Sequence, residues 1–239
     1  SLAQLPGVVG VAVSVVVCVF LGVTIEFLAY RPLRKAPSLA VLITAIGVSY
    51  LLQSLALLVF KSEPKAFPTI IEIPSLTFGG VVVDGMTLLT LAVTAVIMIS
   101  LSLFINKTKL GKAMRAVSED KDAAELMGIS VNRTITMTFA IGSALAAVAS
   151  VFYGATYTYI KPTTGSMPGI KAFTAAVIGG IGSIPGAMLG GILLGVLECF
   201  SNSVPALAPY TDAIEFGILI ILLLVRPNGI LGKKRREKV

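Results

Sequence analysis

Six charged residues lie inside long apolar runs of the sequence or at their ends: Glu26, Lys161, Lys171, Glu198, Asp212 and Glu215. Ionisable groups at membrane depth are costly, and they usually conduct ions, protons or charged solutes, or pair with one another. Glu26, Lys161 and Asp212 lie near the ends of their runs, so we interpret them as reaching the membrane surface. Glu198 and Glu215 lie deeper, and we expect them to pair with Lys171 or to face a polar cavity.

The composition is that of an integral membrane protein. Hydrophobic residues make up 56% of the 239 residues and charged residues only 13%, about half the charged share of a soluble domain. The net charge of +7 is concentrated in loops and in the tail Lys233 to Lys238, which fits the cytoplasmic side of a membrane and gives no argument for nucleic acid. Cys18 and Cys199 both lie in apolar runs, where we expect small buried side chains and no disulfide.

The apolar runs predict an all-α, polytopic bundle of transmembrane helices in a single domain over residues 1–239. A bilayer needs about 20 apolar residues per helix. The predicted spans cover residues 5–30, 39–60, 86–105, 134–159, 171–182 as a half-length helix, 186–200 and 213–225. A short hairpin fits residues 73–83. The chain begins at Ser1 in the middle of an apolar run, so we expect the natural N-terminus to lie further upstream.

The positive-inside rule places Arg31–Lys35, the polar loop 106–133 and the tail on the cytoplasmic side. Residues 160–170 then lie outside, and two passes are required before the last span. The segment from Lys171 to Glu198 is short for two full passes, so we infer a half-length helix to Gly182, a turn at 183–185 and a returning helix. Broken helices at membrane depth occur where they are buried in protein or line a cavity. This segment is therefore the best indication of a transport path.

Glycines recur every four residues at Gly182, Gly186 and Gly190, and again at Gly191 and Gly195. On a helix this spacing gives a flat strip that favours close helix packing. The alternative is a direct role in the path for Gly179, Gly180, Gly182 and Ser183, because a break in the helix frees backbone groups to face a solute. Gln53, in the second span, is also too polar to face lipid and is a candidate for the path.

The polar loop 106–133 is predicted to contain a cytoplasmic helix. Ser118 is a suitable N-cap, Glu119 and Asp120 would follow in the first turn, and Gly128 is a natural stop. The residues Asp122-Ala123-Ala124 followed by Gly128 are similar to the EAA---G signature of ABC importer permeases, with Asp in place of Glu. A solvated connector is the simpler alternative.

The sequence contains no nucleotide-binding or His-based metal motif. It has no Gly-x-x-x-x-Gly-Lys-[Ser/Thr] and no dinucleotide-binding glycine fingerprint, and it contains no histidine. We therefore expect no catalytic residues, no metal and no cofactor in this chain. If ATP drives the transport, the ATPase is a separate subunit.

Five blocks together resemble the permease subunits of branched-chain amino acid ABC importers of the LivH type. They are AYRPLR (29–34), LITAIGVSYLLQ (42–53), TKLGKAMRAVSEDKDAAELMGI (108–129), GIKAFTAAVIGGIGSIPGAMLGG (169–191) and RPNGILG (226–232). The resemblance covers essentially the whole chain. The family usually opens with further membrane segments that have no counterpart here.

The resemblance implies a multi-pass protein of a prokaryotic cell membrane with several partners. These are two cytoplasmic ATPases that bind the ATP, a second permease subunit (LivM-like or a second copy), and an external binding protein that delivers leucine, isoleucine or valine. The coupling helix would be about Ser118 to Met127. Ala123, Ala124 and Met127 would form its apolar docking face, and the charged rim would comprise Arg115, Glu119, Asp120 and Asp122.

Three alternatives stay open at this point. A urea or short-amide ABC permease has similar glycine and coupling blocks. A self-sufficient secondary transporter would need carboxylates that couple ions or protons, of which only Glu198 and Glu215 are suitable. A scaffold protein would explain the glycine strip but not the broken helix.

Overall fold

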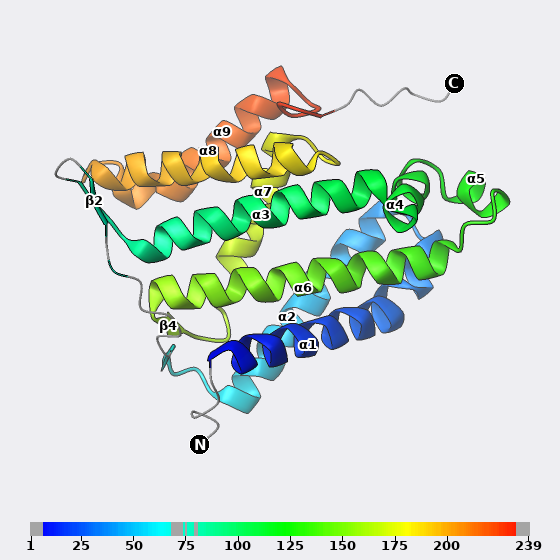
Figure 1. Cartoon of the computed structure of the whole chain (residues 1–239), viewed down its shortest axis with the longest axis horizontal. Coiled ribbons are helices and arrows are strands. Elements are labelled where there is room, and N and C mark those ends of the chain that lie inside the picture. Colours follow the sequence, from blue (N-terminus) through cyan, green and yellow to red (C-terminus); the bar gives the residue numbers. More distant parts are fainter. Residues whose placement is uncertain (1–6, 68–73, 75, 79–80, 233–239) are drawn as a thin grey trace. The chain divides into compact units, whose positions relative to one another are not determined.

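The computed structural model describes residues 7–67, 74, 76–78 and 81–232 (Figure 1). The chain divides into two units. One comprises Ser1–Ala95 with Leu103–Thr163, and the other comprises Val96–Ser102 with Thr164–Val239. The expectation of one domain over residues 1–239 stays a prediction.

Six helical segments of the described residues are long and apolar enough to cross a membrane. They are Val9–Tyr30, Leu39–Phe60, Gly85–Lys107, Val131–Tyr157, Ile184–Ser203 and Ala208–Val225. Strands account for only a few residues. The predicted all-α, multi-pass fold is thereby confirmed.

The first unit is built from α-helices joined by short turns. In chain order the helices are α1 (Gly7–Ile25), the π-helical turn η1 (Glu26–Tyr30), the 3-10 turn η2 (Pro32–Lys35), α2 (Ser38–Phe60), α4 (Lys109–Glu119), α5 (Lys121–Leu126) and α6 (Val131–Tyr157). The long helix α3 (Gly85–Lys107) precedes α4 in the chain, and its middle part, Val96–Ser102, is assigned to the second unit. Helices α1 and α6 lie side by side, with Gly22 against the Ser143 side chain (Figure 1). The ring of Tyr30, in η1, lies tilted against that of Phe139, with their centroids 5.1 Å apart.

Two short strand pairs also belong to the first unit. Strand β1 (Lys65–Ala66) pairs antiparallel with β4 (Tyr159–Ile160), and this pairing joins the loop after α2 to the end of α6. Strands β2 (Leu76–Phe78) and β3 (Val81–Val83) form a hairpin, with Leu76 opposite Val83. The hairpin considered possible from the sequence is therefore present.

Glu26 was expected to extend out of its span to the surface, but its side chain is buried within the protein. Its side chain is 1% exposed, it forms an ion pair with Arg34, and it accepts a 2.8 Å hydrogen bond from the hydroxyl of Thr136 on α6. The interpretation was wrong because the chain stays helical from α1 through the π turn, and η2 then returns Arg34 to the same point. A buried carboxylate is stable only with such partners.

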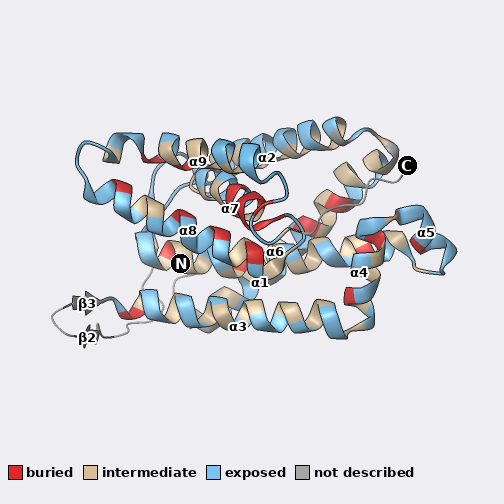
Figure 2. Ribbon diagram, turned by 90° about the horizontal axis from the view of Figure 1, so that it is seen from above, coloured by how far each residue is buried: buried red, intermediate tan, exposed pale blue. Residues whose placement is uncertain are grey.

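The second unit contains α7 (Ser166–Gly179), α8 (Ile184–Ser203), the 3-10 turn η3 (Ala208–Tyr210) and α9 (Thr211–Val225). Helix α7 packs against both α8 and α9. Ala175, Ile178 and Leu194 form the buried core between them, and Leu197, Leu219 and Leu222 pack against it. Buried residues concentrate on α7, as Figure 2 shows.

The half-length helix is present, but its bounds differ from the predicted 171–182. Helix α7 begins five residues earlier and ends at Gly179, so its 14 residues span about 21 Å. The earlier start is possible because Pro168 lies in the first turn, where a backbone N–H needs no partner within the helix. The returning helix α8 has 20 residues, more than the predicted 186–200, and is therefore of full spanning length.

The glycine spacing is explained partly by helix packing. Gly186 and Gly190 of α8 are buried, and a Cβ at Gly190 would collide with the backbone of Ala175 on α7. Gly182 is exposed in the turn before α8, and a Cβ at Gly195 would meet nothing within 4 Å. The strip is therefore two glycines long on α8, with Gly179 of α7 facing Gly186.

Gly190→Val should lower the melting temperature of the purified protein because the added side chain forces α7 away from α8. Overpacking of this kind costs about 1–3 kcal/mol. The matched control is Gly195→Val, on the same helix but facing open space, which should melt close to wild type. Equal melting temperatures for the two variants would contradict the packing described here.

Candidate functional site

A cluster of charged side chains joins the three helices of the second unit. The Nζ of Lys171 on α7 lies 2.9 Å from Glu198 Oε1 on α8. It also lies 3.2 Å from Asp212 Oδ1 and 3.3 Å from Glu215 Oε2, both on α9. One ammonium group is thus shared by three carboxylates, which we call the Lys171 cluster.

The position of each residue along its helix brings the cluster together. Lys171 is in the second turn of α7, Glu198 is in the last turns of α8, and Glu215 follows Asp212 by three residues on one face of α9. The start of α7, the end of α8 and the start of α9 therefore meet at one end of the unit. Ala175, Leu194 and Leu219, each four residues from a member of the cluster, form the apolar core directly beside it.

The Lys171 cluster carries two more negative charges than positive ones if all four groups are ionised. Glu215 is 1% exposed, and its Oε2 accepts no hydrogen bond. Glu198 and Asp212 are more accessible, with 38% and 50% of their side chains exposed. All three carboxylates hold Lys171, and the two accessible ones, Glu198 and Asp212, are also suited to a second cationic group. In the described part of the chain, no group of three or more His, Cys, Asp or Glu side chains is arranged to hold a metal.

The sequence analysis identified most of this cluster. Of the two alternatives given for Glu198 and Glu215, pairing with Lys171 is the one observed. Asp212 was interpreted only as reaching the surface; it is half exposed, and it also binds Lys171. The signal that could have identified Asp212 is its spacing of three residues from Glu215, which places both on one helix face.

The break between α7 and α8 is a four-residue turn at the other end of α7. Gly179 and Gly180 are buried, and Gly180 has φ +107°, a left-handed conformation that favours glycine. The hydroxyl of Ser183 accepts a 3.2 Å hydrogen bond from the N–H of Gly186, so Ser183 is the N-cap of α8. Gln53, the remaining candidate for the path, is on α2 in the first unit and donates to Ser49 of the same helix at 3.2 Å.

The polar loop contains two helices instead of the single helix predicted from Ser118 to Gly128. Helix α4 ends at Glu119, and the Asp120 carboxylate caps α5 by accepting 3.1 Å hydrogen bonds from the N–H groups of Asp122 and Ala123. Ser118 is inside α4, where its hydroxyl donates to Arg115 O at 2.7 Å. The prediction of Ser118 as the cap was wrong. Ser and Asp both suit an N-cap, but the helix dipole also favours the ionised carboxylate of Asp120.

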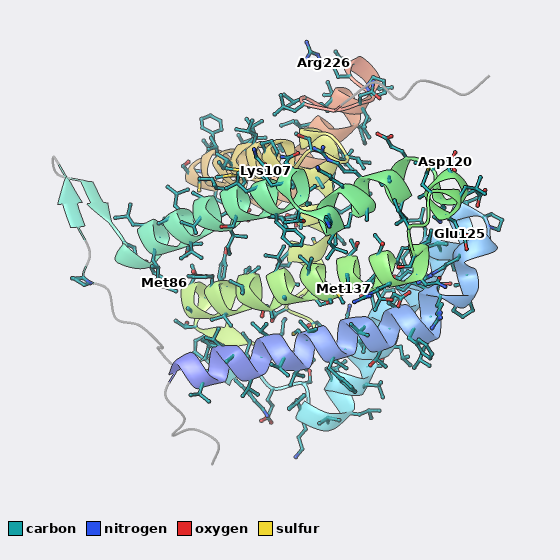
Figure 3. The ribbon with its side chains drawn as sticks, turned by 45° about the vertical axis from the view of Figure 1, so that its right-hand side comes forward. Met86, Lys107, Asp120, Glu125, Met137 and Arg226 are labelled. Atoms are coloured by element: carbon teal, nitrogen blue, oxygen red, sulfur yellow. The ribbon has the colours of Figure 1, made fainter. Side chains whose placement is uncertain are left out.

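The predicted stop at Gly128 is confirmed. Gly128 has φ +80°, its N–H donates to Glu125 O at 2.9 Å, and the N–H of Ile129 donates to Ala124 O at 3.0 Å. These two bonds form a complete Schellman ending. Figure 3 shows Asp120 and Glu125 close to the two ends of this short helix.

The exposed face of α5 differs from the one expected. Ala124 is 3% exposed, because it is turned toward the chain where α5 meets α4 and α6, so it does not belong to a docking face. Leu126 and Met127 are 89% and 82% exposed, and Ala123 is exposed beside them. Leu126 was missed although it follows Ala123 by three residues on the same face.

The charged residues expected around this face are accessible at most positions. Glu119 and Asp122 are exposed, and Asp120 is half-buried in its capping role. Arg115 is exposed on α4, and its guanidinium donates to the side-chain oxygen of Asn106. Glu125 and Lys121 add two further exposed charges on α5 that the sequence analysis did not name.

The comparisons with known proteins agree on one class of protein, the branched-chain amino acid transport permeases. Residues 3–223 match the family described as the branched-chain amino acid transport system permease component. The chain is 49% identical over 233 residues to the high-affinity branched-chain amino acid transport system permease protein BraD of Pseudomonas aeruginosa, a match that covers 95% of this chain and 75% of that protein. It is 43% identical over 237 residues to the corresponding protein LivH of Escherichia coli K12, covering 95% and 74%.

A more distant relative is the fructose import permease protein FruG of Bifidobacterium longum, 28% identical over 135 residues, which is 54% of this chain and 39% of that protein. No solved structure matches the chain. The family match covers nearly the whole sequence, and the six membrane-length helices make the protein a multi-pass protein of the cell membrane. The chain therefore belongs to the family of branched-chain amino acid transport system permease components.

Proposed function

We propose that this chain forms part of the translocation path of an ABC importer for leucine, isoleucine and valine. The observation that carries the proposal is the 49% identity, over 95% of the chain, to a protein whose name specifies that transport. The broken α7–α8 pair supports it, because irregular backbone at membrane depth occurs where helices line a path.

The partners proposed for the chain are those of an importer. Two cytoplasmic ATPase subunits bind and hydrolyse ATP, an external binding protein delivers the amino acid, and a second permease subunit, LivM-like or a second copy, completes the path. The chain itself is not an enzyme in this scheme. The positive-inside rule places the polar loop 106–133, with its six Lys and Arg residues, on the cytoplasmic side and the Lys171 cluster toward the outer side.

Helix α5 is the proposed contact with an ATPase subunit. Its exposed Ala123, Leu126 and Met127 supply an apolar face, and Lys121, Asp122 and Glu125 supply charges around it. An apolar centre with a charged rim is typical of protein interfaces, where the rim contributes to orientation and rate of association more than to affinity. The rigid Asp120 cap and the Schellman ending at Gly128 hold this face in one conformation.

The Lys171 cluster is the proposed contact for the charged end of the amino acid. Glu198 and Asp212 are accessible and together offer more negative charge than Lys171 neutralises, so they suit the α-ammonium group. Lys171 suits the α-carboxylate. Urea and short amides carry no ammonium group, and they would gain less from this surplus of charge. The cluster thus favours an amino acid over the urea alternative.

The proposed substrate can be tested with the complete importer in proteoliposomes, supplied with its binding protein and with ATP inside. We expect ATP-dependent uptake of labelled leucine that excess isoleucine or valine inhibits and excess urea does not. Uptake of urea without uptake of leucine would contradict the proposal and support the amide alternative.

Leu126→Asp should prevent the ATPase subunits from co-purifying with the permease. The substitution places a charge at the centre of the apolar face, where burial without a partner is strongly unfavourable. Ser130→Asp is the matched control, since it adds the same charge at the exposed N-cap of α6, where an acid is favourable. Full co-purification of the Leu126→Asp protein would exclude α5 as the contact.

Glu198→Gln should raise the KM for leucine about tenfold or more, the effect of losing a hydrogen bond of roughly 1.5–3 kcal/mol between charged groups. Glu198→Asp should retain part of the affinity. Glu63→Gln, an exposed acid in the loop after α2, should leave KM unchanged. A wild-type KM for Glu198→Gln, with a wild-type melting temperature, would show that the cluster only connects the helices.

A further inference from the structure

The segment Arg226–Gly232, which directly follows α9, folds back onto the C-terminal end of α7. A turn closed by a 3.0 Å hydrogen bond from Gly229 N–H to Arg226 O reverses the chain. The N–H of Ile230 then donates to Ile178 O at 2.9 Å, and the N–H of Leu231 donates to Gly179 O at 3.0 Å. We call this segment the strap. In Figure 1 it is the red turn beside the yellow end of α7, and Figure 3 labels Arg226 at its start.

The strap completes the capping of α7. A helix leaves its last four carbonyl groups without partners in the helix. The N–H of Gly180 lies 3.0 Å from Ala176 O and 3.2 Å from Val177 O, and the strap binds the carbonyls of Ile178 and Gly179. All four orphan carbonyls of this half-length helix therefore have a donor, and two of the donors come from about fifty residues further along the chain.

The contact is made by backbone on backbone. A Cβ at Gly229 would lie 2.6 Å from the Cα of Gly180 and 2.7 Å from Val177 O, and Gly180 similarly faces the backbone of Gly232. The large side chains of the strap are partly buried, since Ile230 is 37% exposed and Leu231 is 45% exposed. Undocking the strap would therefore lose part of their apolar contact. It would also leave two carbonyls unpaired, which water can satisfy when it reaches that end of the helix.

The strap is also connected to the break in the helix. Gly180, against which Gly229 packs, is the first residue of the turn, and Gly179 packs against Gly186 in the first turn of α8. Arg226, the first residue of the strap, is bonded to the last turn of α9 through its N–H and Leu222 O at 2.6 Å. The end of α9 is thus connected to the α7–α8 turn through the strap.

We propose that the strap is a releasable cap on α7. Docked, it satisfies the helix end and covers Gly180; released, it lets water reach the carbonyls of Ile178 and Gly179 when the path opens on that side. This inference rests on the proposed function in one respect, namely that the chain alternates between two states in an ATP-driven complex.

The test measures access to the strap in the assembled importer. In a Cys18→Ser, Cys199→Ser background, Leu231→Cys serves as the reporter, because it keeps the backbone N–H that bonds to Gly179. Its rate of modification by a water-soluble maleimide is measured in the resting complex and in the complex trapped with ATP and vanadate. We expect the two rates to differ by about tenfold or more, as a shift of the docking equilibrium requires. Lys107→Cys, at the exposed end of α3, is the control and should react equally in both states.

A second variant separates a releasable cap from a fixed structural contact. Gly229→Ala places a Cβ against Gly180, so complexes that still assemble should modify the Leu231→Cys reporter rapidly in both states. Equal rates in the two states without this substitution, whether slow or fast, would overturn the proposal, as would a slow reporter in an assembled Gly229→Ala complex. The rates do not depend on the substrate. A complex that changes reporter access but takes up no leucine would therefore contradict only the proposed substrate.

Discussion

The second unit depends on one constraint: α7 has only 14 residues, and its last four carbonyl groups have no partners within the helix. A buried backbone group without a partner is costly, so other parts of the chain have to supply the donors. Gly180 and the strap supply them to the four carbonyls from Ala176 to Gly179. Close approach of the two backbones requires glycine at Gly180 and Gly229, which explains why glycine-rich blocks occur both at the break and after α9.

Helix α7 is attached to α9 near its start as well as at its end. Near the start of α7, Lys171 binds Asp212 and Glu215 in the first turns of α9, and at the end of α7 the strap continues from the last turn of α9. Because α9 is held at both ends of α7, the two helices cannot slide past each other without breaking the ion pairs or the strap hydrogen bonds. A substrate that competes for the carboxylates at one end would therefore weaken the attachment at that end first.

The sequence predicted the spans well because hydrophobic length is a local property, and counting the crossings was enough to infer the broken helix. The exact ends of the helices were harder to predict, because several residues suit the same position. Either Ser118 or Asp120 could cap the helix in the polar loop, and Pro168 is tolerated inside the first turn of α7. Pairings between distant residues were harder to predict. The burial of Glu26 depends on Arg34, which η2 brings back, and on Thr136, which lies 110 residues away in the sequence. The sequence of the strap likewise gives no local indication of its contact with α7.

The exposed pair Leu126 and Met127 shows how membrane context changes the meaning of an apolar surface. Many large apolar side chains of the spans are exposed in the isolated chain, and lipid is their expected neighbour. Leu126 and Met127 belong to a short helix between two spans, among the charged residues Lys121, Asp122 and Glu125, where lipid is not the expected neighbour. An apolar pair held rigidly in a polar loop suits burial by another protein. The sequence could locate this helix but not its docking side, because burial of Ala124 against the chain, and not its residue type, decides which face remains free.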